Sequence, residues 1–336
     1  MVYVNLKMNS INYEEFTIID KEYLKKKNLY GKDPLERDFS EVLDKGVIIL
    51  DKPSDVTSQD LVIHIKRALN INKASHVGTL DPKVTGILPI LLNRAVKLNH
   101  YLSKQDKEYV VLMNIHKEME EDKIISILKG FEGEINQLPP RKSAVKRKVR
   151  KRKIYAIEIL EIDSNRYVLF KAKVQAGTYI RALCRDFGRI SGVGAHMQEL
   201  RRTESLGFNE KEAINFYDFY ERAYLYSTFN KYEPLRDIII PVEEVIFRNF
   251  KPVYVKDEAA SSIVYGAKLF PRGIIMHHNR IKKGEIVGVF TLKKELIGLM
   301  KTTIDFNNLN FSSKKPVAIP ERIFITPKEM PRLWKK

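Results

Sequence analysis

The chain has 336 residues, 44% of them hydrophobic and 30% charged, which is enough for a catalytic-size domain plus a smaller one and excludes wholesale disorder. The formal net charge of +17 favours a polyanionic partner, either nucleic acid or an anionic membrane surface. The best apolar run, at 87–92, is far too short to span a membrane, and the single Cys184 excludes an intrachain disulfide and any paired-cysteine zinc motif.

We expect a cytoplasmic protein without metal, because no signal-peptide pattern opens the chain and the seven histidines show no H-E-x-x-H spacing. Residues 1–35 are polar and predict an extension that lies on another part of the protein. A β-branched apolar run at 46–50 predicts a buried strand. An apolar stripe at 59–69 predicts a helix with Thr57 or Ser58 as its N-cap.

The segment at 76–82 (HVGTLDP) carries one acid, Asp81, with almost no other charge around it. The following proline biases Asp81 toward an extended conformation, and Gly78 and Gly86 permit tight backbone geometry on either side. An isolated Asp-Pro is most often a turn or a helix cap, and we expect a helix at 89–102 that Asp81 would cap. The alternative is a single carboxylate presented at the edge of an apolar floor.

Periodic patterns predict further elements along the middle of the chain. The expected strands are 109–113, 155–162 and 167–174, and the expected helices are 120–130 and 179–187. We expect Thr178 to cap the last of these helices. Arg181 then lies one turn inside it, at a strand-to-helix corner of the kind that often carries functional groups. A surface pair between Arg181 and Asp186 is the alternative.

A dense cationic run lies between the Pro-Pro break at 139–140 and the predicted hairpin. Nine of the residues at 141–153 are Lys or Arg, among them Arg141, Lys142, Lys146, Arg147, Lys148, Arg150, Lys151 and Arg152. Such a run repels itself and stays mobile until something neutralises it. The plain interpretation is a solvated loop or a localisation signal. Its position inside a domain favours a flexible arm that closes on a phosphate backbone.

The character of the chain changes near Phe250, after a mixed linker at 231–247. The expected elements there are strands at 253–255, 286–290 and 296–300 and a helix at 257–265. Short strands at close spacing predict a small β-barrel-like module.

Four motifs occur in order: GVIILDKP at 46–53, HVGTLDP at 76–82, PPRKSAVK at 139–146 and GTYIR at 177–181. With them the chain resembles the TruB family of RNA pseudouridine synthases. The segment at 192–203 (GVGAHMQELRRT) resembles the archaeal, dyskerin-like branch that works with guide RNA. The C-terminal module resembles a PUA domain, although the segment at 271–273 (PRG) departs from the usual Pro directly before Gly.

The resemblance implies an α+β fold. A pseudouridine synthase domain with a central mixed or antiparallel sheet flanked by helices precedes a small β-barrel-like PUA domain. The implied divisions are an extension at 1–35 that packs on the PUA domain, a catalytic domain at 36–249, a PUA domain at 250–327 and a tail at 328–336.

The implied activity is the isomerisation of uridine to pseudouridine in RNA, with ribosomal RNA as the expected substrate and transfer RNA as a second one. The reaction breaks the C1′–N1 bond and joins C1′ to C5 of the same base. No redox change occurs and no atom is lost, so we expect no cofactor and no metal. A carboxylate can serve as the nucleophile, and a guanidinium partner offsets the cost of its charge in an apolar pocket.

By resemblance, Asp81 is this carboxylate, Arg181 is its partner, and Tyr109 packs on the base once it has left the stack. Leu200 matches an apolar wall of the substrate pocket. Ordinary core packing is the competing role for Tyr109 and Leu200. 

Weaker assignments follow from the same resemblance. His76 and Lys52 belong to motifs near the substrate pocket. The cationic run matches a thumb loop that closes over RNA. Gly266 and Lys268 are expected RNA contacts of the PUA domain.

The guide-RNA branch implies partners. They are H/ACA guide RNA and substrate RNA, a small zinc-ribbon protein and a small β-barrel protein docked on the catalytic domain, and a kink-turn-binding L7-like protein held through the guide RNA. Two alternatives stay open, a stand-alone tRNA pseudouridine-55 synthase and a catalytically silent RNA-binding scaffold. The intact set of Asp81, Tyr109 and Arg181 argues against the scaffold.

Overall fold

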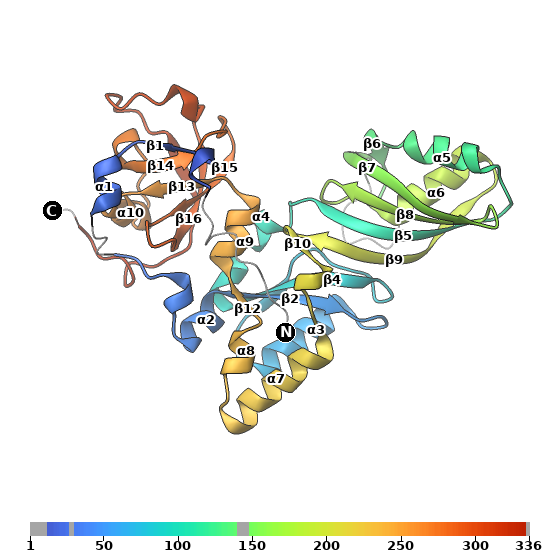
Figure 1. Ribbon diagram of the computed structural model, residues 1–336, viewed down its shortest axis with the longest axis horizontal. Coiled ribbons are helices and arrows are strands. Elements are labelled where there is room, and N and C mark those ends of the chain that lie inside the picture. The colour runs from blue at the N-terminus through green and yellow to red at the C-terminus, as the bar shows by residue number, and fades with distance from the viewer. Residues whose placement is uncertain (1–11, 27–29, 140–147, 334–336) are drawn as a thin grey trace. The chain divides into compact units, whose positions relative to one another are not determined.

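The computed structural model describes residues 12–26, 30–139 and 148–333 (Figure 1). The chain divides into two compact units. The first unit holds Ile48–Leu91 and Asn99–Ile238. The second holds the described residues up to Val47, Leu92–Leu98, and the described residues from Ile239 onward. Each unit combines a sheet with helices, as predicted for an α+β protein.

The first unit is built on a mixed sheet with the strand order β11-β2-β4-β9-β5-β8-β7-β6. The bounds are β2 (Gly46–Lys52), β4 (Thr85–Leu92), β5 (Lys107–Ile115), β6 (Gly133–Gln137), β7 (Arg150–Asp163), β8 (Tyr167–Val174), β9 (Ala195–Ser205) and β11 (Ile214–Asn215). β4 pairs with β9 in parallel, whereas β9, β5, β8, β7 and β6 pair antiparallel in succession. Short strands β3 (Ala74–His76) and β10 (Phe208–Asn209) pair with β4 and β9.

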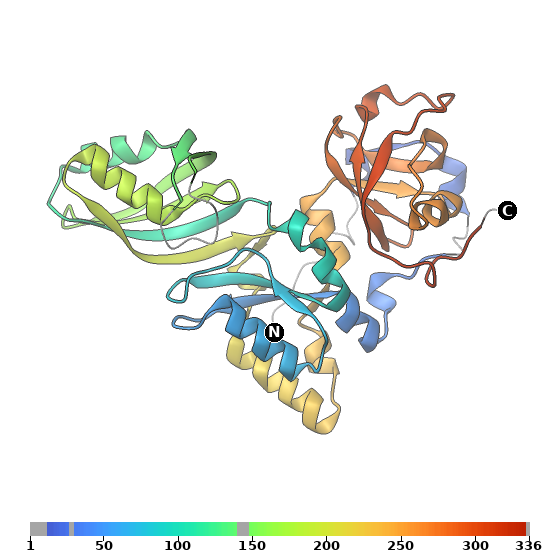
Figure 2. The ribbon, with the colours of Figure 1, turned by 180° about the vertical axis from the view of Figure 1, so that it is seen from behind.

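Helices cover this sheet. α5 (Glu121–Lys129) and α6 (Ile180–Ser191) lie on the same face of β5, β8 and β7 (Figure 1). α3 (Ser58–Ala68) and α7 (Phe216–Phe229) lie side by side in Figures 1 and 2. α4 (Asn99–Leu102) and α8 (Glu233–Arg236) are single turns. Buried and partly exposed residues alternate strictly along β5, as the period of a strand with one core face requires.

The second unit is built on a six-stranded sheet with the order β1-β14-β13-β15-β16-β17. The strands are β1 (Phe16–Ile18), β13 (Pro252–Val255), β14 (Ile274–His278), β15 (Ile286–Phe290), β16 (Leu296–Thr302) and β17 (Ala318–Ile323). The remaining elements are α1 (Lys21–Lys25), α2 (Phe39–Lys45), β12 (Ile239–Pro241), α9 (Val242–Asn249) and α10 (Asp257–Val264). β1, from the N-terminal extension, pairs antiparallel with β14.

A buried group of charges joins distant parts of the second unit. Arg37 donates two hydrogen bonds to Glu243 of α9, at 2.8 and 2.6 Å, and one to Glu295 at 3.3 Å. Lys45 of α2 lies 3.0 Å from Glu295 and 2.5 Å from Glu329. Because a buried ion is costly without a partner of opposite charge, these contacts hold the N-terminal segment against the C-terminal one.

The helix expected at 89–102 is wrong. Thr85–Leu92 is strand β4, and a 3-10 segment at Asn93–Leu98 separates it from the single turn α4. Pro89 is accommodated in the strand, where its carbonyl oxygen accepts a hydrogen bond from the Val77 N–H at 2.8 Å. Asp81 therefore precedes a strand and caps no helix.

Three further expectations are wrong. Thr178 does not cap α6, which begins after Tyr179 without a side-chain capping bond. The supposed linker at 231–247 contains α8, β12 and most of α9. Residues 150–153 of the cationic run belong to β7, where pairing with β6 and an ion pair between Lys151 and Glu134 at 2.7 Å reduce the repulsion.

Candidate active site

Asp81 lies in the loop between β3 and β4 (residues 77–84, the Asp81 loop), and its carboxylate pairs with Arg181. Oδ2 of Asp81 is 3.0 Å from Nη2 of Arg181, in the first turn of α6. The two side chains are 47% and 43% exposed, so the described residues leave the pair open to solvent. The alternative partner, Asp186, is bound by Arg185 at 3.0 Å. Such an exposed pair adds little to stability, and its main effect is to orient the carboxylate.

Two buried side chains hold the backbone next to Asp81. Oγ of Ser58, in α3, accepts the N–H of Leu80 and donates to its carbonyl oxygen, both at 3.0 Å. Nζ of Lys52, at the end of β2, donates to the carbonyl oxygens of Pro82 and Val84, at 2.7 and 2.8 Å. Lys52 is fully buried and supports the backbone of the Asp81 loop, and its place in the substrate pocket stays a prediction.

Arg202 of β9 is also buried and reaches the start of the Asp81 loop. Nε donates to the carbonyl oxygen of Ile87 at 2.6 Å, Nη1 to that of Gly78 at 3.0 Å, and Nη2 to that of Val77 at 3.5 Å. The hydroxyl of Tyr109 lies beside the same guanidinium, and β5 and β9 pair in register at these two residues. Burial lowers the pKa of Arg202, and Tyr109 opposes this shift.

Two more titratable groups lie near Arg202. Lys107 of β5 is buried, with its amine directed to backbone carbonyl oxygens of the preceding turn. Burial and the charge of Arg202 lower the pKa of Lys107 to about 8. Burial and Arg202 also lower the pKa of His76, so its imidazole is neutral at pH 7.

The start of α6 is held by Gln137, the last residue of β6. Its side-chain amide donates to the carbonyl oxygen of Tyr179 at 3.1 Å and accepts the Tyr179 N–H at 2.9 Å. At Gly177, where φ is +79°, a Cβ would lie 3.1 Å from the guanidinium of Arg152. Gln137 and Arg152 thus shape the turn that leads to Arg181. Arg152 is half-buried against this turn, and its contact with RNA stays a prediction.

The remaining predicted site residues lie in the sheet of the first unit and in the second unit. Tyr109 is nearly buried, and Leu200 is half-buried on β9, two residues before Arg202. Both pack within the sheet, and contact of either with a flipped base stays a prediction. Gly266 and Lys268 are exposed in the turn after α10 of the second unit.

The cationic run is described only in part. Arg141, Lys142, Lys146 and Arg147 lie outside the described residues, whereas Lys148, Arg150, Lys151 and Arg152 lie within them. The predicted closure of this run over RNA is therefore not tested by the fold.

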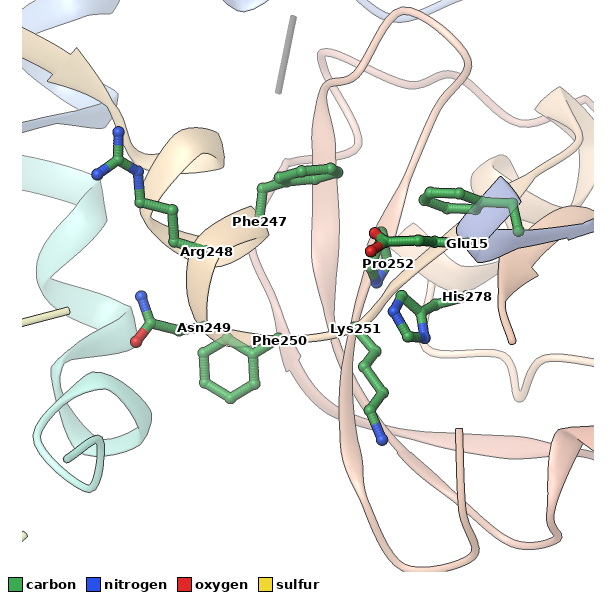
Figure 3. A pocket seen from close by; sticks show the side chains of 9 residues that line it. Glu15, Phe247, Arg248, Asn249, Phe250, Lys251, Pro252 and His278 are labelled. Atoms are coloured by element: carbon green, nitrogen blue, oxygen red, sulfur yellow. The ribbon is translucent and has the colours of Figure 1, made fainter. Parts of the chain in front are cut away.

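Figure 3 shows a pocket of about 250 Å³ in the second unit. Its lining residues are Glu15, Phe16, Phe247, Arg248, Asn249, Phe250, Lys251, Pro252 and His278. Two of its cations are engaged within the protein, Arg248 with Glu244 at 2.6 Å and Lys251 with Glu285 at 2.9 Å. None of these residues belongs to the Asp81 site.

Neither a metal cluster nor a membrane span is found in the described part of the chain. No three His, Cys, Asp or Glu side chains there gather around a point where a metal ion would fit. Every helix there is too short or too polar to cross a bilayer.

Known proteins match most of this chain. Family profiles match for a TruB family pseudouridylate synthase N-terminal domain at 66–180, a tRNA pseudouridylate synthase B C-terminal domain at 181–246, a PUA domain at 251–319 and a DKCLD domain at 5–62. A probable tRNA pseudouridine synthase B of Thermococcus onnurineus is 43% identical over 306 residues, 91% of either chain. The chain belongs to the TruB family of pseudouridylate synthases. It is an RNA pseudouridine synthase with a C-terminal PUA domain.

Further relatives of this pseudouridylate synthase agree. A probable tRNA pseudouridine synthase B of Methanocaldococcus jannaschii is 41% identical over 326 residues, 97% of this chain and 96% of the relative. A solved Cbf5-Nop10-Gar1 complex matches with a TM-score of 0.88 and 42% identity, over 95% of this chain and 96% of that one. An H/ACA RNP bound to a substrate RNA containing 2′-deoxyuridine matches with a TM-score of 0.87 and 39% identity, over 95% and 97%. The predicted fold and family are confirmed.

The sequence does not indicate the supporting residues of this pseudouridylate synthase. Its local pattern predicts Ser58 only as a helix cap and predicts no role for Gln137. Arg202 stands inside the segment at 192–203 that resembles the family, so its place in a motif is visible. Its burial is not, because a charged side chain in an unassigned segment is expected at the surface.

Proposed function

We propose that this pseudouridylate synthase isomerises uridine with Asp81 as its catalytic carboxylate, as the catalytic subunit of an H/ACA guide-RNA particle in the cytoplasm. The observation that carries the catalytic role is the ion pair between Asp81 and Arg181 at 3.0 Å. It presents one solvent-accessible acid on a loop whose backbone is fixed on both sides of Asp81. A carboxylate held in this way can act as a nucleophile or stabilise charge while the C1′–N1 bond breaks and the C1′–C5 bond forms.

The neighbouring residues take complementary roles in the proposal. Arg181 orients the carboxylate, and Lys52 supports the Asp81 loop from below. Tyr109 packs on the flipped base, while Leu200 and the neutral imidazole of His76 lie at the edge of the substrate pocket. The cationic run and the exposed Gly266–Lys268 turn contact the RNA backbone.

The guide-RNA assignment is supported by the similar solved structures, whose titles name an H/ACA RNP with substrate RNA and a Cbf5-Nop10-Gar1 complex. The DKCLD match at 5–62 adds an N-terminal extension to the synthase and PUA parts. We accordingly propose an extension at 1–35, a catalytic domain at 36–249, a PUA domain at 250–327 and a tail at 328–336. The proposed partners are guide RNA, substrate RNA, two small proteins docked on the catalytic domain, and a kink-turn-binding L7-like protein held by the guide RNA.

A second candidate is a stand-alone tRNA enzyme, because the similar curated relatives are named probable tRNA pseudouridine synthase B. The two are separated by assaying purified protein on a transfer RNA and on a guide-matched substrate RNA, each with and without guide RNA and partner proteins. Turnover of the matched substrate only in the assembled particle supports the guide-dependent role. Equal turnover of transfer RNA by the protein alone supports the stand-alone one.

The catalytic role of Asp81 is tested by Asp81→Asn. This change keeps the size of the side chain but removes its charge, so pseudouridine formation should fall below detection while the Kd for substrate RNA changes by less than about three-fold. Arg181→Ala should lower turnover much more than affinity. Turnover by Asp81→Asn within ten-fold of the unmodified protein would remove Asp81 from the proposed role.

A further inference from the structure

The two glycines that flank Asp81 both rest against Arg202. Gly78 has φ of +74°, and a Cβ there would lie 3.1 Å from Nη1 of Arg202. Gly86 has φ of +100°, and a Cβ there would lie 2.2 Å from the carbonyl oxygen of Arg202. Only glycine allows the chain to approach both the side chain and the backbone of Arg202 in these conformations.

The guanidinium of Arg202 is buried and donates to neutral groups. Within the described chain it donates to the carbonyl oxygens of Val77, Gly78 and Ile87, and the hydroxyl of Tyr109 lies beside it. The charged group near it that the pKa values indicate is another cation, Lys107. A buried cation usually pairs with a carboxylate, because removing it from water costs several kcal/mol. A cation kept in the core with neutral partners makes a weak contribution to stability, and its directional hydrogen bonds are better explained by a need for exact geometry.

We propose that Arg202 is a positioning residue of the isomerisation reaction, which supports the Asp81 loop and holds Tyr109 in register with it. The proposal rests on the proposed role of Asp81. Val77 and Gly78 begin the loop and Ile87 lies in β4, just after it, so the hydrogen bonds of one side chain tie the start of the loop to the strand that follows it. The Tyr109 contact adds strand β5 to the same assembly.

Such a support matters because the reaction rate depends steeply on the position of the catalytic group. A catalytic group displaced by about 1 Å loses about 100-fold in rate, because the reacting atoms are no longer aligned. Lys52 and Ser58 hold the residues adjacent to Asp81, but their hydrogen bonds do not reach Tyr109. Arg202 contacts both the loop and Tyr109, so its loss should let the two move independently while the Asp81–Arg181 pair still forms.

Arg202→Met tests this idea, because it keeps the length of the side chain and removes its charge and donors. We expect turnover to fall by about 30- to 100-fold, with the Kd for substrate RNA changed by less than about three-fold. Hydrogen–deuterium exchange should become faster at the hydrogen-bonded amides of Val77, Leu80 and Val84. The matched control is Arg201→Met, which removes the next arginine of β9, paired with Asp51 at 2.8 Å; turnover and loop exchange should stay within two-fold.

A conservative variant and a double-mutant cycle separate positioning from folding. Arg202→Lys keeps the positive charge but lacks the planar set of guanidinium donors. Its turnover should lie between those of the unmodified protein and Arg202→Met. The losses from Arg202→Lys and Tyr109→Phe should be non-additive, because both break one contact. If Arg202→Met does not fold, the proposal is tested by this cycle and by the hydrogen–deuterium exchange of the Asp81 loop in Arg202→Lys.

Loop exchange equal to the unmodified protein, additive losses, or an affinity loss as large as the turnover loss would each overturn the proposal. Failure of the proposed function has a different signature, namely an active Asp81→Asn variant. The exchange measurement needs no activity, so it still reports whether Arg202 supports the loop.

Discussion

At the scale of single residues, buried cations distinguish this protein. Lys52, Lys107 and Arg202 are each almost inaccessible, and all three donate to backbone carbonyl oxygens of the first unit. Carbonyl oxygens supply part of the solvation that water gives, but a formal opposite charge would supply more. The consequence is electrostatic, since burial and, to a smaller extent, the neighbouring charge of Arg202 lower the pKa of Lys107.

Lys107 should make stability depend on pH. Its pKa is about 8 in the folded protein and near 10.5 in the unfolded one, so between these values the unfolded chain binds more protons and stability rises with pH. From pH 7.5 to 10 this contribution amounts to about 2 kcal/mol of unfolding free energy. Burial raises the pKa of Cys184 to about 12, so above pH 9 this thiol makes stability fall as pH rises. The contribution of Lys107 must therefore be measured as the difference between the unmodified protein and a Lys107 variant.

The measurement is urea unfolding at pH 7.5 and 10 for the unmodified protein and for Lys107→Met. The variant should lack the contribution of about 2 kcal/mol, whereas Lys173→Met, at an exposed position of β8, should keep it. Parallel pH dependence in the unmodified protein and Lys107→Met would mean that Lys107 stays fully charged in the fold.

At the scale of elements, the site depends on where α6 begins. Arg181 can meet Asp81 only because α6 begins at Ile180, and the two-way bond between Gln137 and the Tyr179 backbone fixes that start. This bond takes the place of the side-chain cap that Thr178 was expected to provide. The 3.6-residue period predicted the helix, but the identity of its cap depended on a strand end some 40 residues earlier in the chain.

Gln137→Leu should therefore impair catalysis through the helix. It keeps the side-chain volume and leaves the Tyr179 N–H without its partner, which costs about 1–3 kcal/mol of unfolding free energy. The Tyr179 carbonyl oxygen still accepts the N–H groups of Ala182 and Leu183. Turnover should fall by about ten-fold at unchanged affinity for substrate RNA, because Arg181 moves relative to Asp81. Single-turnover rates test this, with Asn136→Leu, at the exposed neighbouring position of β6, as the control. An equal fall in both variants would contradict a specific role of the Gln137 bond.

At the scale of the whole molecule, the two units rely on different stabilising interactions. The sheet of the first unit is enclosed by apolar residues such as Val111, Met113 and Phe170. The second unit adds a buried ionic network in which Arg37, far from the C-terminal sheet in sequence, meets Glu243 and Glu295. A network of this kind is strongly destabilised by removing one member, because the remaining charge stays buried.

Arg37→Met should lower the unfolding free energy of the second unit by about 3–5 kcal/mol. Arg37→Met combined with Glu243→Gln should recover much of the loss, because the amide oxygen still accepts the Leu296 N–H at 3.2 Å and no acid of that pair is left uncompensated. Thermal unfolding of both variants is compared with that of Arg280→Met, which removes an exposed arginine of the same unit. If the losses of unfolding free energy from the two substitutions simply add in the double variant, the interaction between Arg37 and Glu243 contributes no stability of its own.

The sequence by itself determined the family, the fold class and the identity of the central pair. Strands such as β5 and helices such as α3 and α10 follow from local periods of 2 and 3.6 residues, which report burial within one element. The motifs at 76–82 and 177–181 name Asp81 and Arg181 through their resemblance to the TruB family, and the contact of the two side chains at 3.0 Å agrees with the prediction.

Only the tertiary structure decided what lies beneath that pair. Local patterns do not predict β9. They predict a helix from Pro89 in place of the end of β4, because a short fully buried strand has no alternation to distinguish it. The pairing of β4 with β9 and of β9 with β5 is set by long-range packing, and it brings Arg202 under the glycines at 78 and 86. Whether a charged side chain lies in water or in the core depends on partners that such pairing supplies, and no local pattern contains them.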